Sequence, residues 1–193
     1  MYHIKNDQRS VRSAETILKA LTRLISRQSY DSIKVSELVA EADVGRATFY
    51  RNFDMLEDVL RWRCDLVMDD LFDYVNEYRR TANDSGLMPV LKPVLRFFYL
   101  HSSIVELLLA AERIDILQLA LQRKMELGEQ QESLAGVPAQ YLTYGRIIHA
   151  NAAVQILAHW VQTGKKEPPD MLADGLNNMM LEMSRARAQP VNI

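Results

Sequence analysis

The sequence predicts an all-α protein, and three observations lead to this fold class. Apolar residues recur at three- and four-residue steps along most of the chain, which is the spacing of one helix face. Glycine and proline are sparse, at 7 and 6 of 193 residues, and gather at a few breaks. Two short amphipathic segments joined by a tight turn lie between residues 33 and 54. We expect about nine helices, divided between a three-helix domain at 1–54 and a helical domain at 55–193.

The first three helices are expected to form the N-terminal domain. A continuous apolar stripe predicts the first over residues 10–28, and a short turn follows at 29–32. The second helix must end at Asp43, a residue that tolerates left-handed dihedral angles better than most. Gly45 can then act as the N-cap of a third helix over 46–53.

The third helix has two chemically distinct faces. Phe49 and Phe53 are four residues apart and can face the core together. The other side chains face outward and are of types that bind DNA. Arginine and tyrosine bind phosphate, threonine bonds to base edges, and alanine can touch a thymine methyl. The pattern predicts a helix-turn-helix reader with outward-facing Arg46, Ala47, Thr48, Tyr50 and Arg51.

The C-terminal domain is expected to contain six helices. Asp54 and Glu57 have the spacing of a capping box at the start of the first. The clearest loop is Thr-Ala-Asn-Asp-Ser-Gly at 81–86, and Pro93 suggests a delayed start or a bend in the helix that follows. The six helices are expected over residues 55–80, 88–100, 103–110, 115–128, 141–163 and 170–185.

Charge and cysteine content narrow the function classes. The formal net charge is only −2, but lysine and arginine outnumber the acidic residues in 1–53, whereas acidic residues dominate the remainder. A mildly basic head suits one end that faces phosphate. The single cysteine, Cys64, excludes a disulfide framework. We interpret Cys64 as a small buried residue, with a redox sensor as the alternative.

Several other classes are not supported. The N-terminus lacks the apolar run of a signal peptide, so we expect a cytoplasmic protein. Enzyme motifs are absent and the histidines are widely spaced, so we expect no catalysis, no metal and no cofactor. The stretch 147–162 lacks formal charge, but its polar residues make a membrane span costly. These are His149, Asn151, Gln155, His159 and Gln162.

Residues 11–60 also carry a specific set of motifs. After an apolar first helix come Glu-Ala-Asp-Val at 41–44, Thr-Phe-Tyr at 48–50, and Phe53 followed by an acidic helix start. This set resembles the N-terminal domain of the TetR family of bacterial transcription regulators. The resemblance implies an all-helical dimeric regulator whose C-terminal domain senses a small molecule. By position, it implies DNA contacts from Lys34 and Ser36 as well as from the outward face of the third helix.

The chain departs from the family pattern at two positions. Asp43 stands where the family usually has glycine. Leu56 stands where it usually has a lysine that touches phosphate, and leucine cannot make that contact.

The C-terminal domain has more apolar helix surface than one core requires. A dense aromatic and aliphatic run at 97–109 indicates core packing first, but such residues also line ligand pockets between helices. A pocket here would take an apolar to neutral molecule. The candidate lining residues, each of which could simply be core, are Trp62, Phe97, His101, Leu108, Leu117, Tyr144 and Ile148.

The last two helices are expected to form a homodimer interface. The helix over 141–163 is apolar on nearly all sides between 147 and 161, so a second face needs a cover. The methionine-rich helix over 170–185 can complete an isologous four-helix bundle, which implies a palindromic DNA site. The expected interface residues are Ile147, Ala153, Val154, Val161, Leu172, Leu176, Met179 and Met183.

A second, weaker resemblance concerns the end of the chain. Trp160-x-x-x-Gly164, then Lys-Lys-Glu-Pro-Pro and a methionine-rich helix, is similar to a branch of the family that includes dihydroxyacetone-kinase activators. Some members of that branch act through a partner protein. We therefore expect a ligand-responsive regulator, a repressor released from a palindromic operator by a small molecule. The alternative is a coactivator of the same fold controlled by a partner protein.

Overall fold

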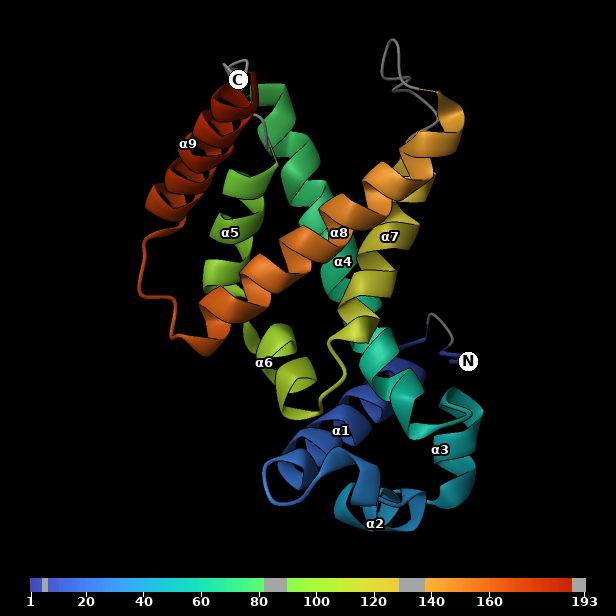
Figure 1. Cartoon of the computed structure of the whole chain (residues 1–193). Helices are drawn as coiled ribbons and strands as arrows, with labels where there is room; N and C mark the ends of the chain where they lie inside the picture. The colour runs from blue at the N-terminus through green and yellow to red at the C-terminus, as the bar shows by residue number, and fades with distance from the viewer. Residues whose placement is uncertain (5–6, 82–89, 129–137, 189–193) are drawn as a thin grey trace. The chain divides into compact units, whose positions relative to one another are not determined.

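The structure is a computed structural model that describes residues 1–4, 7–81, 90–128 and 138–188. Within these ranges every secondary-structure element is a helix, which confirms the predicted all-α class. Nine α-helices and one 3-10 helix are present among the described residues (Figure 1). They are α1 (Gln8–Ile25), η1 (Tyr30–Ser32), α2 (Val35–Glu41), α3 (Arg46–Asn52), α4 (Leu56–Thr81), α5 (Leu91–Leu100), α6 (Ser103–Ala110), α7 (Asp115–Gly128), α8 (Ala139–Gln162) and α9 (Pro169–Ala188).

The chain divides into two compact units. The first holds residues 1–68 and 103–154, and the second holds 69–102 and 155–193, so that α4 and α8 each contribute to both. The predicted boundary between residues 54 and 55 divides a DNA-binding domain from an effector-binding domain. It lies inside the first unit and stays a prediction.

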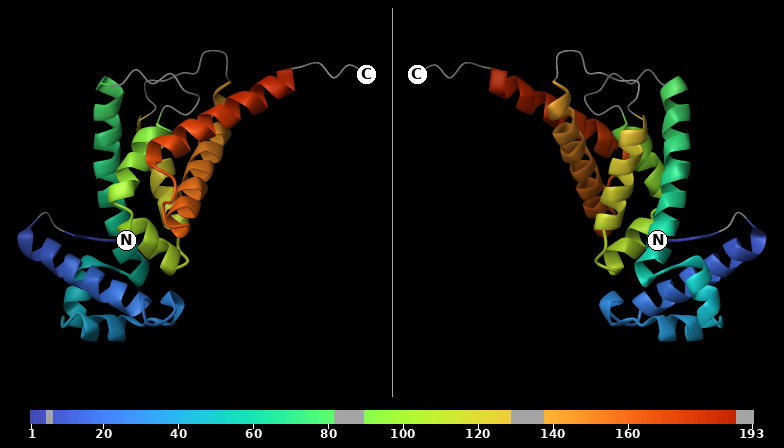
Figure 2. Two further views of the ribbon diagram at one scale, coloured as in Figure 1. Left: turned by 90° about the vertical axis from the view of Figure 1, so that its left-hand side faces the viewer. Right: turned by 90° about the vertical axis from the view of Figure 1, so that its right-hand side faces the viewer.

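Helix α1 supplies the core of the N-terminal three-helix group. The Asp7 carboxylate accepts a hydrogen bond of 2.8 Å from the Ser10 amide, so the helix begins at Gln8, earlier than the periodicity suggested. It ends at Ile25, three residues before the predicted end. The predicted stripe is buried except for Leu18, which is half-buried. The buried residues are Ala14, Ile17, Ala20, Leu21, Leu24 and Ile25. In both views of Figure 2, α1, α2 and α3 lie together.

The turn between α2 and α3 lies where the sequence placed it. Asp43 has a φ of 51°, in the left-handed region that the sharp turn was expected to need. The Val44 amide donates to the Val39 carbonyl at 3.0 Å, which closes the end of α2. Gly45 is then the extended N-cap residue of α3, and its carbonyl accepts from the Thr48 amide at 2.9 Å.

The predicted capping box at the start of α4 is wrong. The residue that caps this end is Asp58, whose carboxylate accepts from the amides of Asp54 and Met55, both at 3.1 Å. Helix α4 begins at Leu56, so Asp58 is close enough to reach back to the free amides. Glu57 points elsewhere and forms ion pairs with Arg61 and Arg113.

In the second unit, α9 lies along α5 (Figure 1). Two ion pairs join them in antiparallel register. Arg96 binds Asp170 through two bonds of 2.7 and 2.6 Å, and the Lys92 amine lies 2.8 Å from the Asp174 carboxylate. Helix α5 begins at Leu91, which agrees with a delayed start near Pro93.

The break before α9 also follows the sequence. Gly164 has a φ of 82°, and the Lys165 amide donates to the Trp160 carbonyl at 2.8 Å, so a glycine in the left-handed region closes the C-terminal end of α8. In the part of the chain that the structure describes, no single helix meets the length and composition of a membrane span, whereas α5 and α6 together pass that test as one bent pair.

Candidate nucleic-acid interface

Helix α3 carries the predicted reading face, and its inner side explains why that face is fixed. Phe49 and Phe53 are both fully buried, and their ring centroids are 5.8 Å apart. The Tyr50 ring packs edge-on against Phe49 at 5.3 Å, yet 56% of Tyr50 remains exposed. The aromatic core therefore holds one side of the Tyr50 ring, while most of the residue is accessible.

The remaining predicted residues are accessible to different degrees. Arg46, Ala47 and Arg51 on α3 are exposed, and Thr48 is half-buried. Lys34 and Ser36 at the start of α2 are exposed as well. The Glu37 carboxylate accepts from the Lys34 amide at 2.9 Å and so fixes the first turn of α2. The seven predicted residues thus come from the two helices of one helix-turn-helix.

The basic residues of this region divide into two groups. Arg23 in the last turn of α1 and Arg27, two residues beyond its end, both pair with Glu41, and the Arg23 hydrogen bond holds the Glu41 pKa below its ordinary value. Among the residues that the structure describes, Arg46 and Arg51 have no carboxylate partner. The charge on α3 is therefore available to an external anion, whereas that on the end of α1 is neutralised within the protein.

Asn52 ties α3 to α1, a role that the sequence did not predict. Asn52 is 2% exposed, donates to the Thr48 carbonyl at 2.9 Å, and accepts from the Ser10 hydroxyl at 2.8 Å. It thereby closes the last turn of α3 and joins that turn to the first turns of α1. Its only sequence signal was an amide side chain next to Phe53, which is too common to identify the role.

A shallow hollow lies where α1 meets the turn of the helix-turn-helix. Its volume is about 420 Å³. Arg9 and Arg12, both exposed, line it together with Val44 from the turn. The two arginines are thus close to the reader in the same unit. The hollow is lined by Gln8, Arg9, Arg12, Ser13, Thr16 and Val44.

The predicted pocket residues do not share one environment. Phe97 is buried and its ring lies 4.6 Å from that of His101, which is exposed. Trp62 is buried against Phe53, with centroids 6.1 Å apart. Leu108 and Leu117 are buried in the first unit, whereas Tyr144 and Ile148 are each 65% exposed.

The predicted interface residues likewise differ in exposure. On α8, Val154 and Val161 are already buried within the chain, Ala153 is half-buried and Ile147 is exposed. On α9, Leu172 and Leu176 are half-buried, and Met179 and Met183 are exposed.

Two features bear on metal and redox chemistry. In the described residues, no group of three or more His, Cys, Asp or Glu side chains is placed to hold a metal ion. Cys64 is fully buried in α4, and burial raises the pKa of its thiol to about 12. Such a thiol is almost entirely protonated at neutral pH and unreactive, which favours the structural interpretation over a redox sensor.

Comparisons with known proteins agree with this geometry. Residues 17–61 match the family described as bacterial regulatory proteins, tetR family. Among solved structures, Lin0861 from Listeria innocua has a TM-score of 0.72 at 16% identity, covering 95% of this chain and 94% of that one. No curated protein matches.

Two further solved structures share the fold. A TetR transcriptional regulator from Streptococcus agalactiae 2603V has a TM-score of 0.56 at 19% identity and covers 88% of this chain and 93% of its own. The fatty acid degradation regulator FadR from Bacillus halodurans has a TM-score of 0.54 at 20% identity, covering 92% and 96%.

The fold and the exposed face of α3 define a DNA-binding transcription regulator of the helix-turn-helix class. The match over residues 17–61 contains α2, α3 and the turn between them. This part of the chain is therefore a DNA-binding domain like that of the bacterial regulatory proteins of the tetR family. Members of this family are DNA-binding regulators and not enzymes.

Proposed function

We propose that this regulator is a ligand-responsive repressor. It binds a palindromic operator as a homodimer and leaves it when a small apolar to neutral molecule binds the C-terminal helices. The observation that carries the DNA-binding part is the outer face of α3, where Arg46 and Arg51 have no carboxylate partner among the described residues and Tyr50 is exposed. Arginine without a partner next to an exposed hydroxyl suits phosphate and base edges.

The homodimer is supported by an uncovered apolar stripe on α9. Leu172, Leu176, Met179 and Met183 follow the i, i+4, i+7, i+11 spacing of one helix face, and they are half-buried or exposed. The side toward α5 is different, since it carries the buried Ala173 and the two ion-paired aspartates. A second copy of the chain would cover the stripe in a two-fold interface.

On α8 we shift the proposed interface to other residues. Val154 and Val161 are already buried in their own chain, so a partner would gain little from them. An exposed stripe without formal charge runs along another side of α8 at the same helical spacing. This stripe consists of Ile148, Ala152, Gln155 and His159. We propose that it forms the α8 part of the dimer interface together with Ile147 and Ala153.

The chemical class of the proposed effector follows from an aromatic cluster in the C-terminal helices. Phe97 is surrounded by rings, with Tyr74, Phe98 and His101 at centroid distances of 5.9, 5.3 and 4.6 Å. All four belong to the second unit. An aromatic cluster of this kind suits an apolar or neutral ligand. The exposed stripes of α8 and α9 would equally suit a protein, and this is what favours the alternative of a coactivator controlled by a partner protein.

A gel-shift titration with the DNA upstream of the chain's own gene tests the proposal. We expect one retarded complex at about 10⁻⁸–10⁻¹¹ M protein, a range typical of specific DNA binding at physiological salt. Scrambling one half-site should weaken it strongly. An Arg46→Ala/Arg51→Ala variant is the control for non-specific binding. If the upstream DNA binds no better than a scrambled sequence, the repressor hypothesis is contradicted and the coactivator hypothesis is favoured.

A further inference from the structure

The link between α3, the proposed recognition helix, and α4 is short and is fixed by hydrogen bonds. Only Phe53, Asp54 and Met55 separate α3 from α4. Phe53 is fully buried, and its amide donates to the Phe49 carbonyl at 2.8 Å. The next two amides donate to Asp58, which is 3% exposed. The end of α3 and the first turn of α4 therefore behave as one piece, which we call the α3–α4 joint (residues 53–58).

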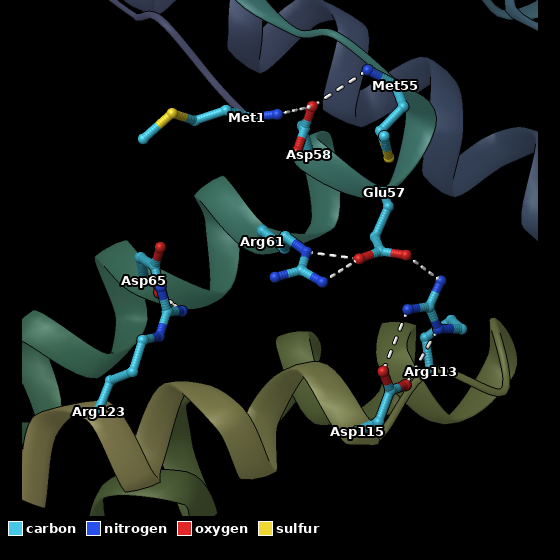
Figure 3. A network of polar contacts seen from close by, with 9 residues as sticks. All are labelled: Met1, Met55, Glu57, Asp58, Arg61, Asp65, Arg113, Asp115 and Arg123. Carbon is cyan, nitrogen blue, oxygen red and sulfur yellow. Dashed lines mark hydrogen bonds and ion pairs between the residues drawn. The ribbon is translucent and has the colours of Figure 1, made fainter.

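An ion-pair network connects this joint to Arg113, which belongs to the same first unit (Figure 3). Glu57, one residue before Asp58, pairs with Arg61 on its own helix and with Arg113 across 2.6 Å. Arg113 also makes two bonds to Asp115, at 3.0 and 3.1 Å. Both partners are largely screened from water, at 25% exposure for Arg113 and 19% for Glu57. The Arg113 hydrogen bond holds the pKa of Glu57 below its ordinary value.

The backbone under Arg113 is itself fixed. The residue lies in the turn between α6 and α7, where Glu112 has a φ of 54° and the Arg113 amide donates to the Leu108 carbonyl at 2.8 Å. This is the hydrogen-bond pattern that closes a helix end. A bidentate bond to Asp115 then sets the plane of the guanidinium. The charge that meets Glu57 is thus presented from a rigid turn.

We propose that Arg113 is a positioning residue for DNA binding, which holds the α3–α4 joint, and with it the recognition helix, from the turn between α6 and α7. It touches no DNA and acts only through Glu57. This proposal rests on the proposed function, because its main readout is operator affinity.

The chain supplies a matched control two helical turns further along α4. There Arg123 of α7 pairs with Asp65 of α4 at 2.9 Å, so it is a second arginine that forms an ion pair with α4 from outside that helix. Asp65 lies outside the joint, and Arg123 is 53% exposed. If every such ion pair to α4 mattered equally, removing Arg123 would have the same effect as removing Arg113. If the joint matters, only Arg113 should control DNA affinity.

The experiment compares Arg113→Met, Arg123→Met and Glu57→Gln by operator titration at several salt concentrations. Arg113→Met and Glu57→Gln should each weaken binding about tenfold, and Arg123→Met less than twofold. The double variant Arg113→Met/Glu57→Gln should be no worse than either single one, because each single substitution already removes the Arg113–Glu57 pair. The salt slope should not change, since no phosphate contact is lost. Arg113→Lys, which keeps the charge, should lose less than Arg113→Met.

Amide hydrogen exchange supplies a readout that does not need DNA. Arg113→Met should speed exchange across residues 53–58 while the helix α1 amides stay protected. Equal loss of affinity in Arg123→Met, additive effects in the double variant, or unchanged exchange at 53–58 would each overturn the proposal. If the wild-type chain binds no operator, the proposed function fails, and the exchange measurement still decides whether Arg113 holds the joint.

Discussion

Helices α3 and α9 each bury one face and expose another, but the exposed faces are opposite in character. Helix α3 rests on the fully buried Phe49 and exposes Arg46, Tyr50 and Arg51. Helix α9 exposes methionines, and Ala173 is its only buried side chain among residues 169–186. An aromatic core holds the first, whereas ion pairs to α5 hold the second.

The difference teaches what each helix lacks. A polar face is stable in water, so the exposure of α3 needs no partner, and its arrangement must be explained by what it recognises. An exposed apolar face is costly, because full burial of each leucine or methionine is worth roughly 1.5–3 kcal/mol. A partner subunit on α9 would therefore contribute stability, and a partner on α3 would contribute specificity.

The largest effect should come from breaking the aromatic support of α3. Phe49→Ala removes a fully buried ring and should lower the free energy of unfolding by about 3–5 kcal/mol. Urea unfolding followed by circular dichroism measures it. Unchanged stability would show that α3 is not packed in the register described above.

The next effect tests the apolar stripe of α9. Met179→Glu would place an unpaired charge in the proposed interface and should weaken dimerisation at least 100-fold, or about 2.7 kcal/mol. Met171 is an exposed methionine of the same helix outside the stripe, so Met171→Glu is the control and should leave the dimer intact. Light scattering of the wild type should give twice 22.2 kDa. A wild-type monomer would contradict both the interface and the palindromic operator.

A smaller effect is expected on the polar face of α3. Arg46→Ala should lower the salt slope of operator binding by roughly one unit for a lost phosphate contact. Tyr50→Phe should weaken binding about tenfold, which corresponds to the 1.4 kcal/mol of one good hydrogen bond. Neither change should alter the melting temperature, since both side chains are exposed. Normal operator binding by both variants would mean that α3 is not the recognition helix.

The smallest effect concerns the ion pairs that hold α9. Arg96→Met should cost no more than about 1 kcal/mol, because Arg96 and Asp170 are 41% and 47% exposed. The Arg96 hydrogen bond lowers the pKa of Asp170 below its ordinary 3.8. The stabilisation is therefore present above pH 3.8 and is lost as the pH falls through the lowered value. Urea midpoints of the two proteins should differ at pH 7 and converge as the pH falls well below 3.8. A constant difference would assign the effect to packing.

Local patterns predicted much of this fold because the information for them is local. Phe49 and Phe53 are buried as their four-residue spacing required, and Asp43 adopts the left-handed turn. The bounds of α6 and α7 agree with prediction, since their apolar runs end at clear breaks.

What the sequence did not predict depends on contacts between distant residues. Arg113 meets Glu57 although 56 positions separate them, and no sequence pattern links the two residues. The choice of Asp58 over Glu57 as the cap follows from the path of the chain. Along α8, two apolar sides share one periodicity, which cannot reveal that Val154 faces the protein's own core while Ile148 is exposed.

The buried thiol of Cys64 has a practical consequence for studying this regulator in solution. Cys64 is fully buried and burial raises the pKa of its thiol, so a maleimide should react with it only slowly in the folded state. A cysteine introduced at the exposed Ala47 could then carry a fluorophore without removing the native one. Slow labelling of Cys64 itself would measure the rate of local unfolding around α4, because the buried thiol must become exposed before it reacts.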